Sequence, residues 1–264
     1  MSVRLAAVGL AALVLGGPAA SAPTRDPGRL TLPSPLPTRT VHVPILMYHR
    51  IDALLPTLPA ITRSLTVDPK MFTQEMDWLV VHRRHTITQR QLFEALMSGK
   101  PLPAHPVMIT FDDGYRDVYQ RALPVLQRRH LRATEYVITD RISGPDPSFL
   151  DWQMLRWLER AGVAIGSHTV SHDDLTSLDD RAALGELVHS RQVLEQRLGH
   201  PVQWLSYPGG SENAHVVALA RTAGYVLAVT TRPGADQSAS SPLELHRDRV
   251  LDTTSLSRFA AFLR

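Results

Sequence analysis

Short hydrophobic runs alternate with amphipathic segments along most of the chain. Apolar runs bounded by polar or turn residues are typical of strands buried on both faces, whereas apolar positions three and four apart indicate helices. Strands are expected at 43–48, 107–111, 134–138, 163–166, 202–206, 225–229 and 245–251. Helices are expected from Asp68, from Thr88 to Gly99, through 118–126, and at 151–160, 179–198, 213–223 and 255–263.

This strand–helix alternation predicts a single α/β domain with a parallel sheet, either open or closed into a (β/α) barrel. Polar residues follow four of the expected strands: His49, Asp112-Asp113, His168 and Tyr207. In parallel α/β folds the carboxyl ends of the strands meet at one rim, where functional sites are built. These residues are therefore expected to lie together.

The composition is that of an ordinary globular protein and narrows the chemistry. The 264 residues are 44% hydrophobic and 20% charged, with a formal net charge of +3. The charge is spread along the chain, and no basic run with interleaved aromatic residues argues for nucleic acid as a partner. The absence of cysteine excludes disulfides, thiolate zinc sites and cysteine nucleophiles, so any metal must be held by His, Asp or Glu.

The first 22 residues have the pattern of a secretory signal peptide. Arg4 supplies a positive start, 5–15 is a short apolar run, and Ala20-Ser21-Ala22 matches the small-residue cleavage pattern. The run is short for a membrane span, so a cleaved signal is favoured over an uncleaved anchor, and no other segment is long enough to span. Residues 23–42, rich in Pro, Thr, Ser and Arg, are expected to link the signal to one catalytic domain at 43–264. The protein is therefore expected to be exported to the periplasm, cell envelope or extracellular space.

Two adjacent carboxylates, Asp112 and Asp113, leave the expected strand 107–111 and are followed by a glycine. Neighbouring residues that leave a strand cannot both point the same way, so one can hold a metal while the other faces a bound water. The alternative is a turn that caps the next helix, which is a common use of the same residues.

A histidine pair with a spacing of four, His168 and His172, follows another strand. On one helical turn or in a tight loop the two rings can converge on one ion. The alternative is a pair of solvated or core-bonded histidines. Together with one aspartate, the pair would make three protein ligands and leave a position open for water or substrate, as catalytic metal sites do.

The chain resembles the polysaccharide deacetylase family, the NodB-like enzymes of carbohydrate esterase family 4. The resemblance rests on the motifs TFDDG, SHTVSH and SYPGG, which occur in the family's order and approximate spacing at 110–114, 167–172 and 206–210. The opening PILMYH at 44–49 resembles the branch that deacetylates poly-N-acetylglucosamine. The resemblance implies a distorted (β/α) barrel and covers nearly the whole expected mature chain.

By position, the resemblance implies that Asp112 is the general base and that Asp113, His168 and His172 are the metal ligands. A divalent ion would activate the attacking water, and Asp112 would take its proton. Zinc suits a His₂-Asp set, and nickel, cobalt and iron are the alternatives. The oxyanion would rest on the metal and on a backbone N–H, for which Gly209 is the candidate, beside Tyr207. Trp152 is a candidate for a sugar-binding wall, although packing at the start of its helix is the favoured interpretation.

The sequence departs from the family pattern at two points. Many members carry an arginine in the third motif that orients the base, and that place holds Ser206 here, so another residue must do this. The general acid has two candidates. His246 weakly resembles the family's late Leu-x-x-His segment, although Arg247 also fits a branch in which this strand carries an arginine and no catalytic histidine. His49 lies at the expected rim.

The function expected from these observations is hydrolysis of N-acetyl groups on an exported glycan, such as poly-N-acetylglucosamine or peptidoglycan. An O-acetyl esterase acting on a xylan-type polymer would use the same chemistry. A glycan-binding homologue that has lost turnover is the alternative of a different class. Four intact residues, Asp112, Asp113, His168 and His172, argue against a binder, which needs no such set.

Overall fold

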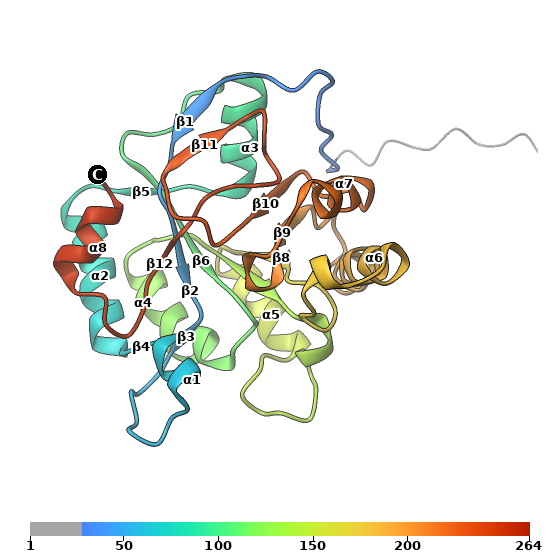
Figure 1. Cartoon of the computed structure of the whole chain (residues 1–264). Helices are drawn as coiled ribbons and strands as arrows, with labels where there is room; N and C mark the ends of the chain where they lie inside the picture. Colours follow the sequence, from blue (N-terminus) through green and yellow to red (C-terminus); the bar gives the residue numbers. More distant parts are fainter. Residues whose placement is uncertain (1–27) are drawn as a thin grey trace, which may run out of the picture.

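The computed structural model describes residues 28–264. Its centre is a curled sheet whose seven main strands run parallel in the order β10-β9-β8-β7-β6-β2-β12 (Figure 1). The short strand β5 pairs with the first residues of β6. The expected segment 1–22 lies outside the described residues. The strands are β1 Thr40–His42, β2 Ile45–Tyr48, β3 Arg50–Ile51, β4 Thr66–Val67, β5 His85–Thr86, β6 Pro106–Phe111, β7 Ala133–Val137, β8 Val163–Ser167, β9 Trp204–Ser206, β10 Leu227–Val229, β11 Asp236–Ser238 and β12 Asp248–Arg249.

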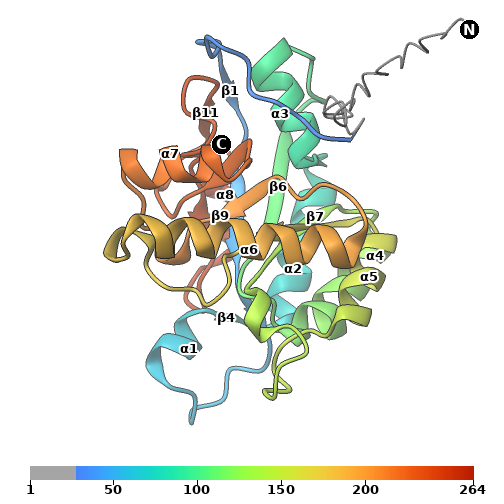
Figure 2. The same cartoon turned by 90° about the vertical axis from the view of Figure 1, so that its right-hand side faces the viewer.

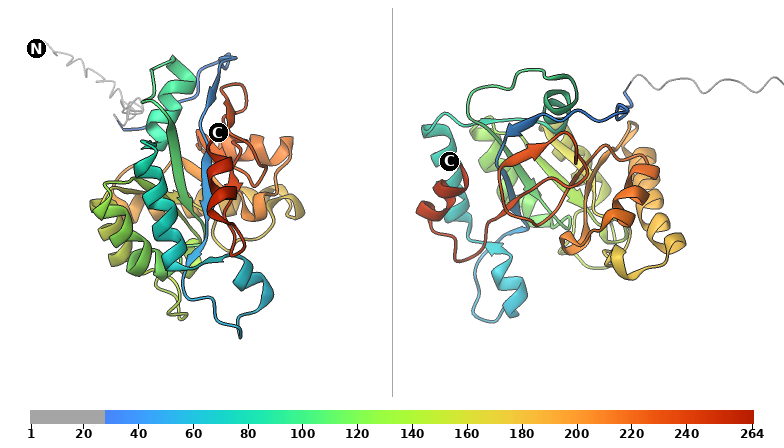
Figure 3. Two further views of the ribbon diagram at one scale, coloured as in Figure 1. Left: turned by 90° about the vertical axis from the view of Figure 1, so that its left-hand side faces the viewer. Right: turned by 45° about the horizontal axis from the view of Figure 1, so that its top comes forward.

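Helices surround this sheet, as the two views of Figure 3 show. Their ends follow local sequence signals. The Asp68 side chain accepts from the backbone of Lys70 at the start of α2, and α6 begins at the Asp179 cap and ends at Gly199 in the left-handed conformation. The helices are α1 Ala60–Ser64, α2 Pro69–Val81, α3 Gln89–Ser98, α4 Leu123–Arg128, α5 Trp152–Arg160, α6 Asp180–Leu198, α7 Ala214–Thr222 and α8 Leu256–Phe262.

The segment that precedes β12 joins the two ends of the curled sheet. Leu245 bonds to Ala228 in β10 and to Thr230 just after it, while β12, which begins three residues further on, pairs in parallel with β2. The fold is therefore the expected distorted (β/α) barrel. The predicted strand 245–251 is much shorter than expected, because its first half bridges to β10 and only Asp248–Arg249 pairs with β2.

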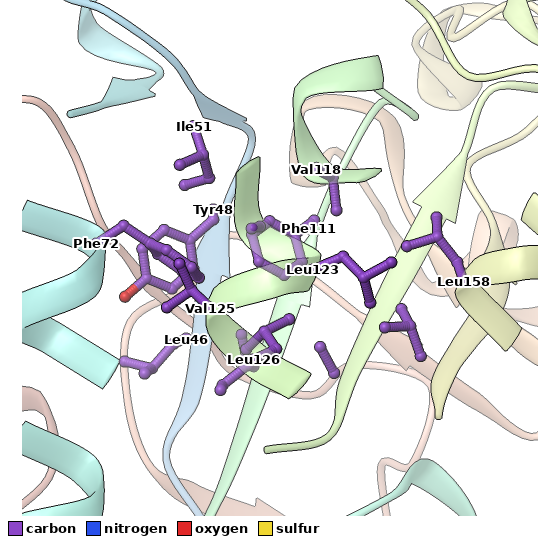
Figure 4. Close-up of a cluster of buried hydrophobic side chains, with 14 of the residues drawn as sticks. Leu46, Tyr48, Ile51, Phe72, Phe111, Val118, Leu123, Val125, Leu126 and Leu158 are labelled. Atoms are coloured by element: carbon purple, nitrogen blue, oxygen red, sulfur yellow. The ribbon is translucent and has the colours of Figure 1, made fainter. Parts of the chain in front are cut away.

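The core lies between the sheet and the helices around it. Figure 4 shows one of its clusters, in which Tyr48 of β2 packs edge-on against Phe72 of α2 at 5.3 Å and beside Phe111 of β6 at 5.5 Å. All three rings are fully buried. On the opposite side, α6 and α7 cover the β8–β10 end of the sheet, and Figure 2 shows α6 crossing in front of the strands.

Two further expectations are corrected. The helix expected through 118–126 begins as a π-helical turn, Val118–Ala122, and continues as α4. The described part of the expected linker is packed against the body: the backbone of Leu30 bonds to the side chain of Gln203, Arg29 pairs with Glu195, and β1 pairs with β11. The folded body therefore starts well before Val43, because Leu30, Leu32 and Val41 bury apolar surface on it. Within 28–264, no helix combines the length and the apolar character needed to cross a bilayer.

Candidate active site

Asp113, His168 and His172 converge at the rim formed by the carboxyl ends of the parallel strands. One potential ligand atom from each residue lies within 4.8 Å of the other two. Asp113 Oδ1 lies 3.4 Å from His168 Nε2 and 3.7 Å from His172 Nε2. Bonds of 2.0–2.1 Å in a tetrahedral zinc site separate neighbouring ligand atoms by about 3.3 Å. The three side chains thus already have the spacing that one small divalent cation requires.

The tautomer of His168 is set by the neighbouring strand. Its Nδ1 lies 2.8 Å from the carbonyl oxygen of Ser206 at the end of β9, and His168 is itself buried at 2% exposure. A carbonyl oxygen only accepts, so Nδ1 must carry the proton and donate. In the neutral ring Nε2 is then the unprotonated nitrogen, as a metal-ligating histidine needs, and it lies 3.4 Å from Asp113 Oδ1.

The histidine pair sits in a tight loop that follows β8. Thr169 and His172 both adopt left-handed backbone conformations, with φ of 65° and 72°. The loop brings the two rings together edge to face, with centroids 4.7 Å apart. His168 is buried, while the side chain of His172 remains 38% exposed. The site is therefore open on the His172 side.

The turn after β6 separates the two aspartates. After Asp112, Asp113 and Gly114 both adopt left-handed backbone conformations, with φ of 80° and 85°. A Cβ on Gly114 would lie 3.1 Å from Ile142 and 3.3 Å from Val137, so the turn requires glycine on both conformational and steric grounds. Beneath it, the buried Glu135 of β7 accepts the Gly114 N–H at 3.0 Å. The two adjacent carboxylates consequently make different contacts, as the sequence predicted.

Asp112 is held by a buried guanidinium. Arg247 donates to both carboxylate oxygens, at 2.8 Å to Oδ1 and 2.7 Å to Oδ2, and the Ser206 hydroxyl donates to Oδ2 at 3.2 Å. Burial alone would raise the pKa of Asp112, but the Arg247 charge, followed by that of His168, holds the pKa far below its usual range. Asp112 is therefore ionised at neutral pH.

Arg247 is the residue that orients Asp112, and the sequence did not assign it this role. It is 1% exposed, and it also donates from Nε to the Thr230 carbonyl at 2.8 Å and from Nη1 to Thr110 at 3.2 Å. Ser206 stands in the third motif where an arginine is common, and its hydroxyl accepts from Arg247 at 3.0 Å. The only sequence signal was the match of Arg247 to a late arginine in one branch of the family.

His49 lies in the site, and the ring of His246 lies beside Gly234. His49 is 8% exposed at the end of β2, and burial lowers its pKa although Asp112 and Asp113 act in the opposite direction. The His246 ring lies beside Gly234, where a Cβ on the glycine would be 3.0 Å from the ring Nδ1.

The three remaining candidates differ in position. A Cβ on Gly209 would meet nothing within 4 Å, and its backbone has φ of 60°, so the space before this turn is open. Tyr207 is fully buried and packs with α6 and α7, so its side chain cannot line a substrate surface. The ring of Trp152 packs on the core beneath the Arg197 guanidinium, 5.2 Å away, which agrees with the favoured packing interpretation.

Burial and local charge also affect Asp113, His168 and His172. Burial opposes protonation of His168, but the bond to Asp113 and the charges of Asp112 and Asp113 outweigh it and raise its pKa. Burial and the neighbouring His168 lower the pKa of His172. Burial would raise the pKa of Asp113, yet the bond with His168 and the charges of His49 and His168 lower it. The carboxylate is thus available as an anionic ligand.

Three comparisons identify the relatives of this chain. A family model described as polysaccharide deacetylase matches residues 99–228. YxkH of Bacillus subtilis, which carries the name of a polysaccharide deacetylase, is 33% identical over 221 residues, covering 84% of this chain and 76% of that protein. The poly-beta-1,6-N-acetyl-D-glucosamine N-deacetylase of Escherichia coli K12 is 29% identical over 121 residues, which are 40% of this chain and only 18% of that protein.

The fold has a solved counterpart. The Streptococcus pyogenes deacetylase PplD, solved in complex with acetate, superimposes with a TM-score of 0.79 at 28% identity, covering 86% of this chain and all of that one. The chain therefore belongs to the polysaccharide deacetylase family, and it is a deacetylase of the hydrolase class.

Proposed function

We propose that this protein is an exported, metal-dependent deacetylase that removes N-acetyl groups from a cell-envelope or extracellular glycan of the poly-N-acetylglucosamine or peptidoglycan type. The observation that carries the proposal is the pairing of two units at one rim: a carboxylate fixed by Arg247, and a three-residue group of metal-ligand spacing. The name of the Escherichia coli relative supports an N-acetylated glycan as the substrate, over the part of the chain that it matches.

Asp113, His168 and His172 would hold the cation, and zinc fits their donor atoms and spacing. A divalent cation in this position supplies an acidified water and polarises the acetyl carbonyl. The chain's part is to present one carboxylate and two imidazole nitrogens with their lone pairs free. The bond from His168 to the Ser206 carbonyl does this for one of the two rings.

Asp112 would act as the general base. Its two oxygens are bound on one side by Arg247 and Ser206, which fixes the carboxylate plane and leaves accepting capacity for a proton of the attacking water. The same guanidinium keeps the carboxylate ionised, which a base requires before the reaction begins. The open turn at Gly209 would offer a backbone N–H to the developing oxyanion.

His49 would donate the proton that the sugar nitrogen needs as it departs. It lies at the end of β2, under the influence of both site aspartates, whereas the His246 ring lies beside Gly234. Replacing His49 by alanine should therefore reduce kcat strongly, by about 10²–10⁴-fold for a lost general acid. Replacing His246 should change kcat little, and an equal loss in the two variants would contradict the assignment.

The decisive test is acetate release from a panel of acetylated glycans. Poly-N-acetylglucosamine oligomers, peptidoglycan and acetylated xylan would be offered to the metal-free protein and to the protein with added Zn²⁺. We expect release from an N-acetylated glycan only with metal. Release from xylan alone would establish the O-acetyl esterase alternative, and no release with any glycan or metal would leave a glycan-binding homologue.

The roles of the two aspartates can be separated with matched variants. Asp112→Asn should abolish turnover and keep metal binding, while Asp113→Asn should weaken metal binding, measured by calorimetry with Zn²⁺. Asp77→Asn, on the exposed side of α2, is the control and should alter neither property. Loss of metal in Asp112→Asn would show that the two roles are exchanged.

Export and domain organisation complete the proposal. Residues 1–22 would act as a signal peptide, and the catalytic domain at 43–264 would carry 29–42 as a packed N-terminal extension. N-terminal sequencing of the protein recovered outside the cytoplasm tests this. A mature N-terminus near residue 23 is expected, and an intact Met1 in a membrane fraction would indicate an uncleaved anchor.

A further inference from the structure

The loop that carries His172 is attached to helix α6 through one carboxylate. Glu186 Oε2 accepts the backbone N–H groups of Val170 and Ser171, both at 2.9 Å, and Glu186 Oε1 accepts the Ser171 hydroxyl at 3.0 Å. Charged acceptors make stronger hydrogen bonds to backbone N–H groups than neutral ones. Three such bonds from one side chain therefore fix the two residues that lie between Thr169 and His172.

This segment needs an external restraint because its backbone is unfavourable. Thr169 and His172 are both in the left-handed region, and neither is glycine. Such residues each carry a conformational penalty of about 1–2 kcal/mol, and they persist only where the surroundings hold them. Left to itself, the loop would relax towards conformations that carry the His172 ring away from Asp113.

The carbonyl side of the loop is held separately. Thr139 and Asp140, which follow β7, donate their backbone N–H groups to the carbonyls of Thr169 and Val170, each at 3.1 Å. Glu186 holds the N–H side from the opposite direction, on a helix that is itself anchored in the core by the fully buried Leu187. The loop is thus clamped between the end of β7 and α6, and Glu186 is the charged half of the clamp.

His168 and His172 depend on this clamp to different extents. His168 follows directly on β8, is buried, and bonds to the Ser206 carbonyl. His172 lies one residue beyond the Glu186 contacts, and its backbone N–H donates within the loop, to the Thr169 hydroxyl at 3.2 Å. The position of His172 relative to the other two ligands is therefore the property that Glu186 controls.

We propose that Glu186 is a positioning residue that sets the metal affinity of the site by holding His172 in place. The inference rests on the proposed function, because it takes Asp113, His168 and His172 as the metal ligands. Glu186 bonds to Val170 and Ser171 and to none of the three ligand side chains. Its contribution is to keep the third ligand within bonding distance before the cation arrives.

The experiment compares two glutamates of the same helix. Glu186→Ala removes the three loop contacts, whereas Glu195→Ala removes bonds to Arg29, Arg191 and the Val202 N–H and leaves the loop untouched. Affinity for Zn²⁺ would be measured by calorimetry, and Co²⁺ absorption would report the ligand geometry. Thermal unfolding of the metal-free proteins would report stability. We expect Glu186→Ala to lose metal affinity by about 10–100-fold, the range typical of lost outer-shell contacts, and to change the Co²⁺ spectrum.

Glu195→Ala should lose stability and keep the metal affinity of the wild type. Glu186→Gln, whose amide oxygen can still accept from the loop, should fall between Glu186→Ala and the wild type. It also provides the measurement should Glu186→Ala fail to fold. Unchanged affinity in both Glu186 variants, or an equal loss in Glu195→Ala, would overturn the inference alone. A wild-type protein that binds no divalent metal would overturn the proposed function as well.

Discussion

Two buried carboxylates in this protein, Asp112 at the rim and Glu75 in the core, show what the site is built to do. Asp112 is 2% exposed and Glu75 is fully buried. Asp112 faces the Arg247 guanidinium, whereas Glu75 of α2 accepts a bond from the Tyr48 hydroxyl at 2.9 Å. The pKa of Asp112 lies far below its usual range, and burial raises the pKa of Glu75 to about 8.

The difference arises from the charge of the partner. Removing a carboxylate from water favours its neutral form, and a neutral hydroxyl compensates only in part. A guanidinium bonded to both oxygens compensates fully and keeps the carboxylate ionised. The fold thus holds a neutral carboxyl bonded to Tyr48 of β2 and an ionised carboxylate bonded to Arg247. Only the ionised one can accept a proton at neutral pH.

Arg247→Met should remove the difference in ionisation between Asp112 and Glu75, and we expect it to have the largest effect on activity and stability. Asp112 would be left buried without a counter-charge, at a stability cost of about 3–5 kcal/mol. Burial would then dominate and raise the pKa of Asp112, so part of the base would be protonated at neutral pH. We expect kcat/KM to fall by at least about 10²-fold, and the residual activity to rise with pH as Asp112 ionises.

The reaction rate and the denaturant unfolding of Arg247→Met would be compared with those of Arg221→Met. This control removes one positive charge from an exposed residue at the end of α7. Arg247→Lys, which keeps the charge and loses the two-pronged contact, should retain more activity than Arg247→Met. A wild-type rate in Arg247→Met would show that Asp112 needs no guanidinium.

Glu75→Gln should show, through the pH dependence of stability, that Glu75 is neutral in the folded protein while Asp112 is ionised. The pKa of Glu75 is about 8 in the folded protein, above its value in the unfolded chain, so the folded state holds this proton more tightly. The stability that this provides is fully present below the unfolded pKa of about 4.3 and is lost as pH rises through the folded pKa near 8. The wild type should therefore lose on the order of a few kcal/mol across this window.

Glu75→Gln keeps an oxygen for the Tyr48 hydroxyl and removes the titration, so its stability should change less over the same range. Urea unfolding at several pH values measures this, with Glu94→Gln, at the half-buried partner of Lys100, as control. Parallel pH profiles for the wild type and Glu75→Gln would show that Glu75 is ionised in the fold.

Ser206→Ala should have the smallest effect of the three. The hydroxyl bridges Arg247 and Asp112, but the two guanidinium bonds to Asp112 remain without it. We expect a loss of about 1 kcal/mol in stability and a decrease of a few fold in kcat/KM. Metal affinity should be unchanged, because His168 bonds to the backbone carbonyl of Ser206. Ser206→Thr should restore the rate, and weaker metal binding in Ser206→Ala would contradict this account.

Local sequence signals predicted the fold class and the metal group. Strand and helix periods, caps such as Asp179 and the glycine at 199 are properties of short segments, and the structure confirms the helix between them. The motifs TFDDG and SHTVSH place their reactive residues directly after strands, so the parallel arrangement alone brings them to one rim. The elements and the positions of these motifs depend on residues that are close in sequence, so they could be predicted without knowing which strands pair.

The surroundings of the site were decided by contacts between distant parts of the chain. Arg247 reaches Asp112 from 135 residues away, and Glu186 of α6 bonds to Ser171 from 15 residues away. Residues 29–42 have the composition of a linker, yet they pack on Gln203 and β11. Tyr207 follows a strand end as a site residue would, but its ring turns into the core beneath α6 and α7.

The physical reason is the range of the interactions. Periodicity and capping act within a few residues, so the sequence alone determined which segments form strands and helices and where the reactive side chains leave them. The ionised state of Asp112, the tautomer of His168 and the choice between His49 and His246 depend on which group lies within a few ångströms in space. Only the curling of the sheet, which brings β9 and the segment before β12 to the end of β6, supplies those neighbours.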